Sequence, residues 1–446
     1  MIAFGGAIGS GLFLGTGSRL HTAGPALAIV YAVAGLFGFL VVRAMGELVM
    51  HRPTTGSLVS YSREFIGEKA AYFAGWMHFL GWACGGIGDI TAAAIYIRFF
   101  FPELPQWVPA AIALAVVVTV NLISVQLFGE IEFWFSAIKI TAIVVFMLIG
   151  IGVLVSRHQI AGEATGPQLI LSHGGLFPGG VLPALMILQG VVFAYAGIEL
   201  VGVTAGEAKN ARDVVPKAVN SIAWRIGVFY IGSVLVLVML LPWSSYSGNV
   251  SPFVTVLDKL GVPGAAGVMN LVVLTAAMSS VNSALYSSSR ILRSLAANGS
   301  APKLAGLMGR HGVPYGGVLI TAFVYLIGLI LNVFVAGEAF EIALNFSALG
   351  ILGMWGMIMV SHAAMVRKAK RGQLKRPEYR LPLAPFSNYL TIAFLLLVFA
   401  LSWFDVPAGR TLIYSTPGVL ALLVIGWFGV RRRQRKMAAE RVANLP

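Results

Sequence analysis

Two charged side chains stand deep inside apolar stretches of this sequence, where they could bind a ligand or carry a proton. A charge at bilayer depth costs roughly 2.5–3.5 kcal/mol or more, so each needs a partner or a function. Asp89 is too short to reach a membrane surface, so we expect it to face a cavity, as a substrate contact or as a proton site. Lys139 either extends to the membrane interface, about 9 Å away along its helix, or is a buried amine whose charge changes during a reaction cycle.

Further polar residues occupy apolar stretches, and their spacing admits more than one interpretation. Glu199 either orders an unwound segment of backbone or titrates. Arg43 and Glu47 are one helical turn apart, which predicts an ion pair that closes the inner side of the molecule. Ser279 and Asn282 also lie one turn apart; they either face a central cavity or form hydrogen bonds within and between helices.

Glycine-rich apolar segments are the elements that would position such a ligand site. Six of the fourteen residues at 4–17 are glycine, and each glycine in a helix interior loses roughly 1 kcal/mol relative to alanine. Unpaired amides in hydrocarbon cost several kcal/mol unless they line a cavity or bind something. We therefore predict a broken membrane helix whose free N–H groups face a ligand. A second segment at 189–202, with glycines at 190, 197 and 202, predicts a second broken helix.

The composition is that of an integral membrane protein. The chain has 446 residues, 58% of them hydrophobic and 11% charged, and its mean hydropathy is +0.86. Soluble domains carry about 25% charged residues, so a soluble globular protein is excluded. Lysine and arginine lie in short gaps between apolar blocks, so the net charge of +14 does not indicate nucleic-acid binding. The sequence has neither a P-loop nor a dinucleotide fingerprint, so we expect neither ATP-driven transport nor enzyme activity.

Apolar blocks of about 20 residues predict an all-α protein with twelve membrane helices. The predicted spans lie near residues 2–18, 25–49, 72–100, 107–125, 133–155, 180–203, 224–242, 266–294, 316–336, 340–362, 388–404 and 411–430. We expect a single domain, 1–446, in which the two broken helices indicate inverted five-helix repeats over 1–155 and 180–362. Helices 11 and 12 follow at 388–430, and a basic tail covers 431–446.

Basic residues predict the orientation in the membrane. An even number of spans places both termini on one side, where basic residues outnumber those on the other side by about five to one. Both termini are therefore expected in the cytoplasm, in a multi-pass protein of the cytoplasmic (inner) membrane. Met1 falls directly inside the first apolar block, so we expect either a start further upstream or a shortened copy.

Motifs along the whole chain carry a family resemblance: GGAIGSGLF at 5–13, RAMGEL at 43–48, FGEIEFWF at 128–135, FAYAGIEL at 193–200, PKAVNS at 216–221 and SALYSSSRIL at 283–292. Together they resemble the bacterial amino acid transporter branch of the amino acid–polyamine–organocation superfamily. Within that branch, HRPTTGS at 51–57, YSREFIGEK at 61–69 and DITA at 89–92 are most similar to the L-asparagine permeases. D-Serine/D-alanine/glycine transporters also have an aspartate at the position of Asp89.

The resemblance implies a LeuT-like fold, in which inverted repeats with discontinuous helices 1 and 6 give alternating access to a central site. Matching motifs assign six residues to the substrate: amides around Ile8, Ser10 and Gly11 for its carboxylate, and carbonyls of Phe193, Ala194 and Ala196 for its ammonium group. The assignment is physically sensible, because the positive N-terminal end of a half-helix suits an anion and unwound carbonyls suit a cation.

The expected function is proton-coupled uptake of a small neutral amino acid, with L-asparagine first. Asp89, Ser279 and Asn282 would contact the side chain of the substrate. Lys139 matches the lysine of proton-coupled relatives and would couple the proton, the only ion required, with no cofactor and no metal. The alternatives are a D-serine/D-alanine/glycine permease or a broader neutral amino acid permease, including GABA- or proline-type ones. An amino acid sensor without net transport is an alternative from a different class. The expected partners are the substrate and the lipid bilayer.

Overall fold

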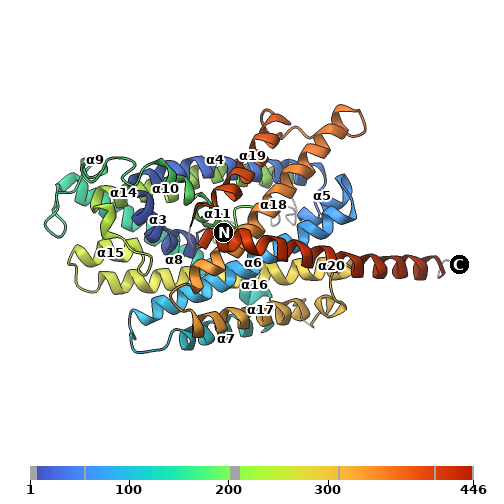
Figure 1. Cartoon of the computed structure of the whole chain (residues 1–446), viewed down its shortest axis with the longest axis horizontal. Helices are drawn as coiled ribbons and strands as arrows, with labels where there is room; N and C mark the ends of the chain where they lie inside the picture. The colour runs from blue at the N-terminus through green and yellow to red at the C-terminus, as the bar shows by residue number, and fades with distance from the viewer. Residues whose placement is uncertain are drawn as a thin grey trace.

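The computed structural model describes residues 8–54, 57–123, 125–200, 211–309, 312–405 and 408–443. In these residues the repeating elements are helices, with one isolated bridge between Ile160 and Glu163. Most of the long helices run roughly along the long axis of the molecule, and the end of α20 (Ala408–Ala443) extends beyond them (Figure 1). The all-α prediction is therefore confirmed, whereas the glycine-rich residues 4–7 lie outside the described part of the chain.

In chain order, the helices of the N-terminal half are α2 (Ser10–Phe13), α3 (Gly15–Ala23), η1 (Gly24–Ala26), α4 (Leu27–His51), α5 (Ser57–Phe65), α6 (Glu68–Arg98), α7 (Trp107–Ile123), α8 (Val125–Ser156), α9 (Leu169–Ser172), α10 (Val181–Met186) and α11 (Leu188–Ala194). In the C-terminal half they are α13 (Ala211–Arg225), η2 (Ile226–Gly232), α14 (Ser233–Leu240), η3 (Trp243–Ser245), α15 (Pro252–Lys259), α16 (Ala265–Ala297), η4 (Lys303–Gly306), α17 (Tyr315–Phe334), α18 (Ala339–Lys370), α19 (Phe386–Leu401) and α20.

Helix length and composition make this a multi-pass membrane protein. Within the described residues, eight helical segments are long and apolar enough to cross a membrane. Shorter apolar helices cover Trp107–Ile123, Val181–Ala194 and Phe386–Leu401.

The long helix α6 lies at the centre of the bundle. In its most apolar stretch 78% of the residues are buried, compared with 22% in α8 and 6% in α20. It packs along both α16 and α18, and the small residues in its middle, such as Ala83 and Ala92–Ala94, allow these neighbours to come close. The central position of α6 brings Asp89 into the interior of the molecule.

The first apolar segment is interrupted near its start. Gly9 has extended backbone (φ −134°, ψ −160°), and α2 begins at the next residue, Ser10. α2 is only four residues long, and α3 begins after Leu14. Backbone amides at the start of α2 therefore face outward from the helix end.

The second interruption follows α11. The helix ends at Ala194, and residues 195–199 form turns. Gly197 has φ +98°, a conformation in which a side chain would be strained, so a glycine is required here. The continuation of this segment over residues 201–210 lies outside the described residues.

Two features of the helices differ from the prediction in a way that matters for the site. α8 begins at Val125, well before the predicted start near 133, so Glu132 lies inside a helix and not in a loop. The predicted span at 224–242 contains the π-helical segment η2, and π-helical turns are frequent at functional sites.

Candidate functional site

The start of α2 contacts α6 through one buried pair of side chains. The Ser10 hydroxyl donates a hydrogen bond to Asp89 Oδ1 over 2.5 Å, and the Ser10 amide also faces this carboxylate. Amides in the first turn of a helix have no acceptor within the helix, and the helix dipole favours an anion beside them. Asp89 thus supplies a carboxylate at the position where the motifs predict the carboxylate of a substrate.

α2 also approaches the end of α11 at backbone distance. A Cβ on Gly11 would lie 2.8 Å from Ala194 Cα and 3.1 Å from the Phe193 ring, so this contact requires a glycine. The Phe193 carbonyl accepts from the Ala196 amide over 2.8 Å, and the Ala194 carbonyl accepts from the Tyr230 hydroxyl over 2.9 Å. Each carbonyl oxygen has a second lone pair that a ligand can use.

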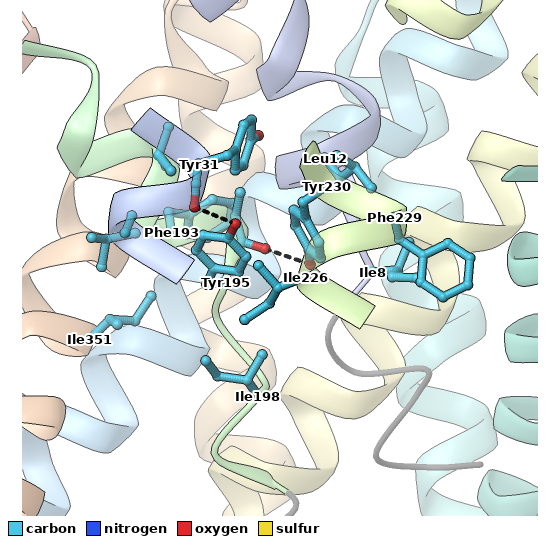
Figure 2. Packing of buried hydrophobic residues seen from close by; sticks show 14 of the residues in the cluster. Ile8, Leu12, Tyr31, Phe193, Tyr195, Ile198, Ile226, Phe229, Tyr230 and Ile351 are labelled. Atoms are coloured by element: carbon cyan, nitrogen blue, oxygen red, sulfur yellow. Dashed lines mark hydrogen bonds between the residues drawn. The ribbon is translucent and has the colours of Figure 1, made fainter. Parts of the chain in front are cut away.

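The two interrupted segments enclose a small cavity together with α6, α16 and α18. Its volume is about 40 Å³, which is room for a few water molecules. It is lined by Gly9, Ser10 and Gly11, by Gly81, Trp82, Gly85 and Asp89 of α6, by Phe193, Ala194 and Ala196, and by Ser280, Ala284, Ser347 and Ile351. Of the residues predicted to bind substrate, Ser10, Gly11, Asp89, Phe193, Ala194 and Ala196 therefore come together here. Ile8 does not line the cavity and belongs to the buried hydrophobic cluster drawn in Figure 2.

Three buried tyrosines pack together next to the end of α11. They were not predicted from the sequence. Tyr31, Tyr195 and Tyr230 have ring centroids 4.6–5.7 Å apart, and the Tyr195 hydroxyl donates to the Tyr31 carbonyl over 2.8 Å (Figure 2). Tyr230 lies on the π-helical segment η2, and its hydroxyl bond to Ala194 holds the carbonyl end of α11 in place. The cluster thus connects α4, α11 and η2.

For Ser279 and Asn282 the structure shows the second of the two alternatives, hydrogen bonds between helices. Ser279 and Asn282, predicted to contact substrate, do not line the cavity. Ser279 faces α8, and Asn282 Oδ1 accepts from Asn121 on α7 over 2.7 Å. The neighbouring Ser280 lines the cavity instead, and within the described residues its hydroxyl has no hydrogen-bond partner. A step of one residue rotates a side chain by about 100° around a helix, and this separates the two serines.

Lys139 is fully buried, so it does not extend to the membrane interface. Its ammonium group donates to the Ser279 hydroxyl over 2.9 Å. The same hydroxyl lies 2.9 Å from both carboxylate oxygens of Glu132, which is also fully buried. Sequence reasoning missed Glu132 because α8 was predicted to start after it. The seven-residue spacing of Glu132 and Lys139, two turns of one helix face, could have indicated it.

The predicted ion pair between Arg43 and Glu47 is wrong. Glu47 binds Arg376 over 2.5 Å and 3.0 Å and His362 over 2.9 Å, and it accepts from the Leu381 amide over 2.6 Å. Arg43 instead donates to the carbonyl of Arg380 and to the side chain of Asn220. Glu47 is fully buried and fixes the segment between α18 and α19 against α4, a long-range contact that helical spacing cannot predict.

Glu199 contacts the turn that follows α11. Its carboxylate oxygens accept from the Gly197 amide over 3.2 Å and 3.3 Å, and Oε2 also accepts from the Trp355 indole over 3.4 Å. These bonds give the Gly197 amide an acceptor and connect the turn with α18. This is what we expect of a residue that orders the interrupted segment.

A small cavity between interrupted apolar helices is typical of secondary membrane transporters. The sequence agrees with this class: the profile of the family described as amino acid permease matches residues 1–439. The chain belongs to the amino acid permease family, whose members are transporters and not enzymes.

Curated relatives from several bacteria cover nearly the whole chain. An L-asparagine permease of Streptomyces coelicolor is 56% identical over 442 residues, which is 99% of this chain and 90% of the relative. An L-asparagine permease of Escherichia coli is 55% identical over 435 residues, 97% of this chain and 87% of the relative. L-Asparagine permease 1 of Mycobacterium tuberculosis is 49% identical over 446 residues, 100% of this chain and 91% of the relative.

Proposed function

We propose that this protein takes up L-asparagine across the cytoplasmic membrane by coupling it to an inward proton gradient. The observation that carries the proposal is the cavity between α2, α6 and α11, which combines helix-end amides, carbonyls and the Asp89 carboxylate in a chain of the amino acid permease family. The names of the relatives, at 49–56% identity, supply the identity of the amino acid.

The proposed architecture has twelve membrane helices, with inverted five-helix repeats over 1–155 and 180–362 and both termini in the cytoplasm. Interruptions near the start of the first segment and after α11 support discontinuous helices 1 and 6. The basic residues between the spans support the orientation. In this arrangement the cavity lies at the interface of the repeats, where secondary transporters bind their substrates.

The amino acid would replace contacts that the protein now makes with itself. Its carboxylate accepts hydrogen bonds from the amide and hydroxyl of Ser10 and from the neighbouring Gly11 amide. The bond between Ser10 and Asp89 is broken in exchange. Asp89 then accepts from the side-chain amide of asparagine, with the Ser280 hydroxyl as a second contact. The ammonium group binds the second lone pairs of the α11 carbonyls.

Substrate binding must widen the cavity. A volume of about 40 Å³ holds far fewer atoms than asparagine has. The element expected to move is α2, which is only four residues long and therefore loses little helical hydrogen bonding when it shifts. We therefore assign this structure to a closed stage of alternating access.

Lys139 is the proposed proton-coupling residue. Lys139 is a buried residue of α8 whose side chain faces α16. It interacts electrostatically with Glu132 and with Asp89. Because Asp89 lines the cavity, the charge on Lys139 is coupled to the group that substrate binding releases.

Competition in proteoliposomes tests the substrate assignment. Purified protein is reconstituted, and unlabelled amino acids compete with labelled L-asparagine for uptake. We expect L-asparagine to compete best, ahead of D-serine, D-alanine, glycine and GABA. Stronger competition by glycine or D-alanine would overturn the substrate assignment, and binding without any flux would favour the sensor.

A further inference from the structure

A stripe of polar side chains follows one face of α8. Glu132, Ser136 and Lys139 are all buried, and their spacing of four and three residues puts them on the same side of the helix. The opposite side carries Trp134 and Ile138, which are exposed as expected for a lipid-facing surface. The polar stripe faces α16, so α8 presents an acid and an amine to the protein interior.

One hydroxyl group lies between the two charges. Lys139 Nζ donates to Ser279 Oγ over 2.9 Å, and Ser279 Oγ donates to Glu132, whose two oxygens both lie 2.9 Å away. Ser136 adds a bond of 3.3 Å to Glu132 from the same helix. The donors along this path all point in one direction, from the amine through the hydroxyl to the carboxylate.

We propose that Glu132 is the proton acceptor for Lys139, with Ser279 as the relay between them. This inference rests on the proposed function, in which Lys139 carries the coupled proton. An N–H bond of the Lys139 ammonium breaks, and its proton bonds to Ser279 Oγ. The original O–H bond of Ser279 breaks at the same time, and that proton bonds to a Glu132 oxygen.

The charge balance of this step suits a membrane interior. Before transfer the pair consists of an ammonium and a carboxylate; afterwards it consists of a neutral amine and a neutral carboxylic acid, and Ser279 is a hydroxyl again. The net charge is zero in both states, so a proton moves without leaving a new unpaired charge in a medium of low dielectric.

The order of the groups along α8 gives the transfer a direction. Glu132 precedes Lys139 by seven residues, about 10 Å along the helix axis, and in the proposed orientation it lies on the cytoplasmic side. Asp89 interacts with Lys139 from α6, on the side of the cavity. The described groups Asp89, Lys139 and Glu132 thus form a route from the substrate cavity toward the cytoplasm, where Glu132 releases the proton once the inner side opens.

Glu132→Gln and Ser279→Ala test the relay, because each interrupts it at a different atom. Labelled L-asparagine uptake is measured in proteoliposomes in two modes: accumulation driven by an inward gradient of about one pH unit, and counterflow exchange without a gradient. With one proton per substrate the gradient supports roughly tenfold accumulation by wild type. We expect both variants to lose this accumulation and fall to about onefold, while counterflow remains.

Two matched controls separate proton transfer from a structural role. Ser279→Thr keeps the hydroxyl and should keep most of the accumulation, and Ser136→Ala removes a bond to Glu132 that lies outside the path and should resemble wild type. Ser279→Ala leaves both charges in place, so it also tests the relay if Glu132→Gln folds poorly.

The outcomes distinguish this inference from the proposed function. Accumulation by Glu132→Gln or Ser279→Ala at the wild-type level would overturn the relay and leave the transport proposal intact. An equal loss of accumulation and counterflow in Ser279→Ala would also overturn it, since a structural role affects both modes. Wild type that exchanges asparagine but never accumulates it would instead contradict the proton coupling itself.

Discussion

Asp89 has two possible partners at the same site, and this competition is central at the scale of single residues. Its carboxylate holds Ser10 at the start of α2, where the carboxylate of an amino acid would bind. In the proposed site an incoming substrate would replace the Asp89 carboxylate with its own at the helix end, so that the amides would keep an anionic partner. The released carboxylate is then available to accept from the side chain of the substrate.

Asp89→Asn is expected to weaken recognition of the asparagine side chain. A hydrogen bond to a charged group contributes about 1.5–3 kcal/mol, which corresponds to roughly a tenfold to hundredfold rise in KM for L-asparagine. L-Alanine has no side-chain amide, so its KM should change much less. Uptake kinetics with both substrates give the comparison. An equal loss for both would contradict a side-chain role and assign Asp89 to the proton instead.

The sequence predicts which residue types form the site, but it does not predict which way every side chain points. Asp89 and Lys139 are identified by the energetic penalty of a charge in an apolar stretch. Asp89 is buried as expected, and the burial of Lys139 decides between the two alternatives that the sequence left open. Ser279 and Ser280 are adjacent in a run of serines, and only the packing of α16 determines which one meets α8 and which one the cavity. Glu132 was missed because an apolar stretch does not reveal where its helix begins.

At the scale of elements, the site depends on the backbone contact between α2 and α11. Gly11 and Ala194 meet without intervening side chains, so the backbones of the two interrupted segments are in direct contact. The tyrosine cluster and Glu199 fix the α11 side, whereas α2 has only four residues of helix before its own interruption. We expect α2 to be the element that moves when substrate enters.

Gly11→Ala should block transport by separating these elements. Its Cβ would lie 2.8 Å from Ala194 Cα, and overpacking of this kind costs about 1–3 kcal/mol, enough to lower uptake roughly tenfold or more. Gly152→Ala on α8 is the matched control, since nothing lies within 4 Å of its Cβ and the position is exposed. Uptake by both variants, normalised to the amount of folded protein, tests the contact. Transport by Gly11→Ala at the control level would contradict it.

The contact between Glu47 and Arg376 should couple α4 to the segment between α18 and α19. Removing one partner of a buried ion pair costs about 3 kcal/mol, so Glu47→Gln should lower the thermal stability measured in detergent. A double-mutant cycle with Arg376→Gln is expected to give a coupling energy of about 1–3 kcal/mol, whereas a cycle with Arg43→Gln should be nearly additive. A coupling energy between Glu47 and Arg43, with none between Glu47 and Arg376, would instead support the ion pair that helical spacing predicted.

Helix positions follow from the sequence more readily than the interruptions and contacts of the helices. Every predicted span overlaps helical residues in the described chain, because twenty apolar residues in a row leave little alternative. The π-helical turn at η2 and the contact of Glu47 with Arg376 depend on neighbours distant in sequence. Local patterns carry no information about such neighbours.

At the scale of the whole molecule, buried charged side chains lie on several helices, among them Glu47 on α4, Asp89 on α6, and Glu132 and Lys139 on α8. α6 is enclosed by its neighbours, while α20 is almost entirely exposed along its apolar stretch. A further set of charges meets where Asp405, between α19 and α20, interacts with Glu341 and Arg19.

Asp405 should make stability depend on pH. Burial raises the pKa of Asp405, the nearby Glu341 raises it further, and Arg19 opposes both. An acid whose pKa is raised in the folded state binds more protons there, so its stabilising contribution is present below the ordinary aspartate pKa and is lost as the pH rises through the raised pKa. Asp405→Asn should therefore unfold at a higher temperature than wild type near neutral pH and at the same temperature under acidic conditions. A difference that grows toward low pH would contradict this assignment.

Gradient-driven accumulation of L-asparagine by purified protein tests the central claim most directly. Proteoliposomes with an imposed inward proton gradient are given labelled L-asparagine, and the internal concentration is compared with that outside, with and without a protonophore. We predict accumulation above the external concentration that disappears when the protonophore collapses the gradient. Equilibration to the external concentration alone, or accumulation that survives the protonophore, would contradict proton-coupled uptake by this protein.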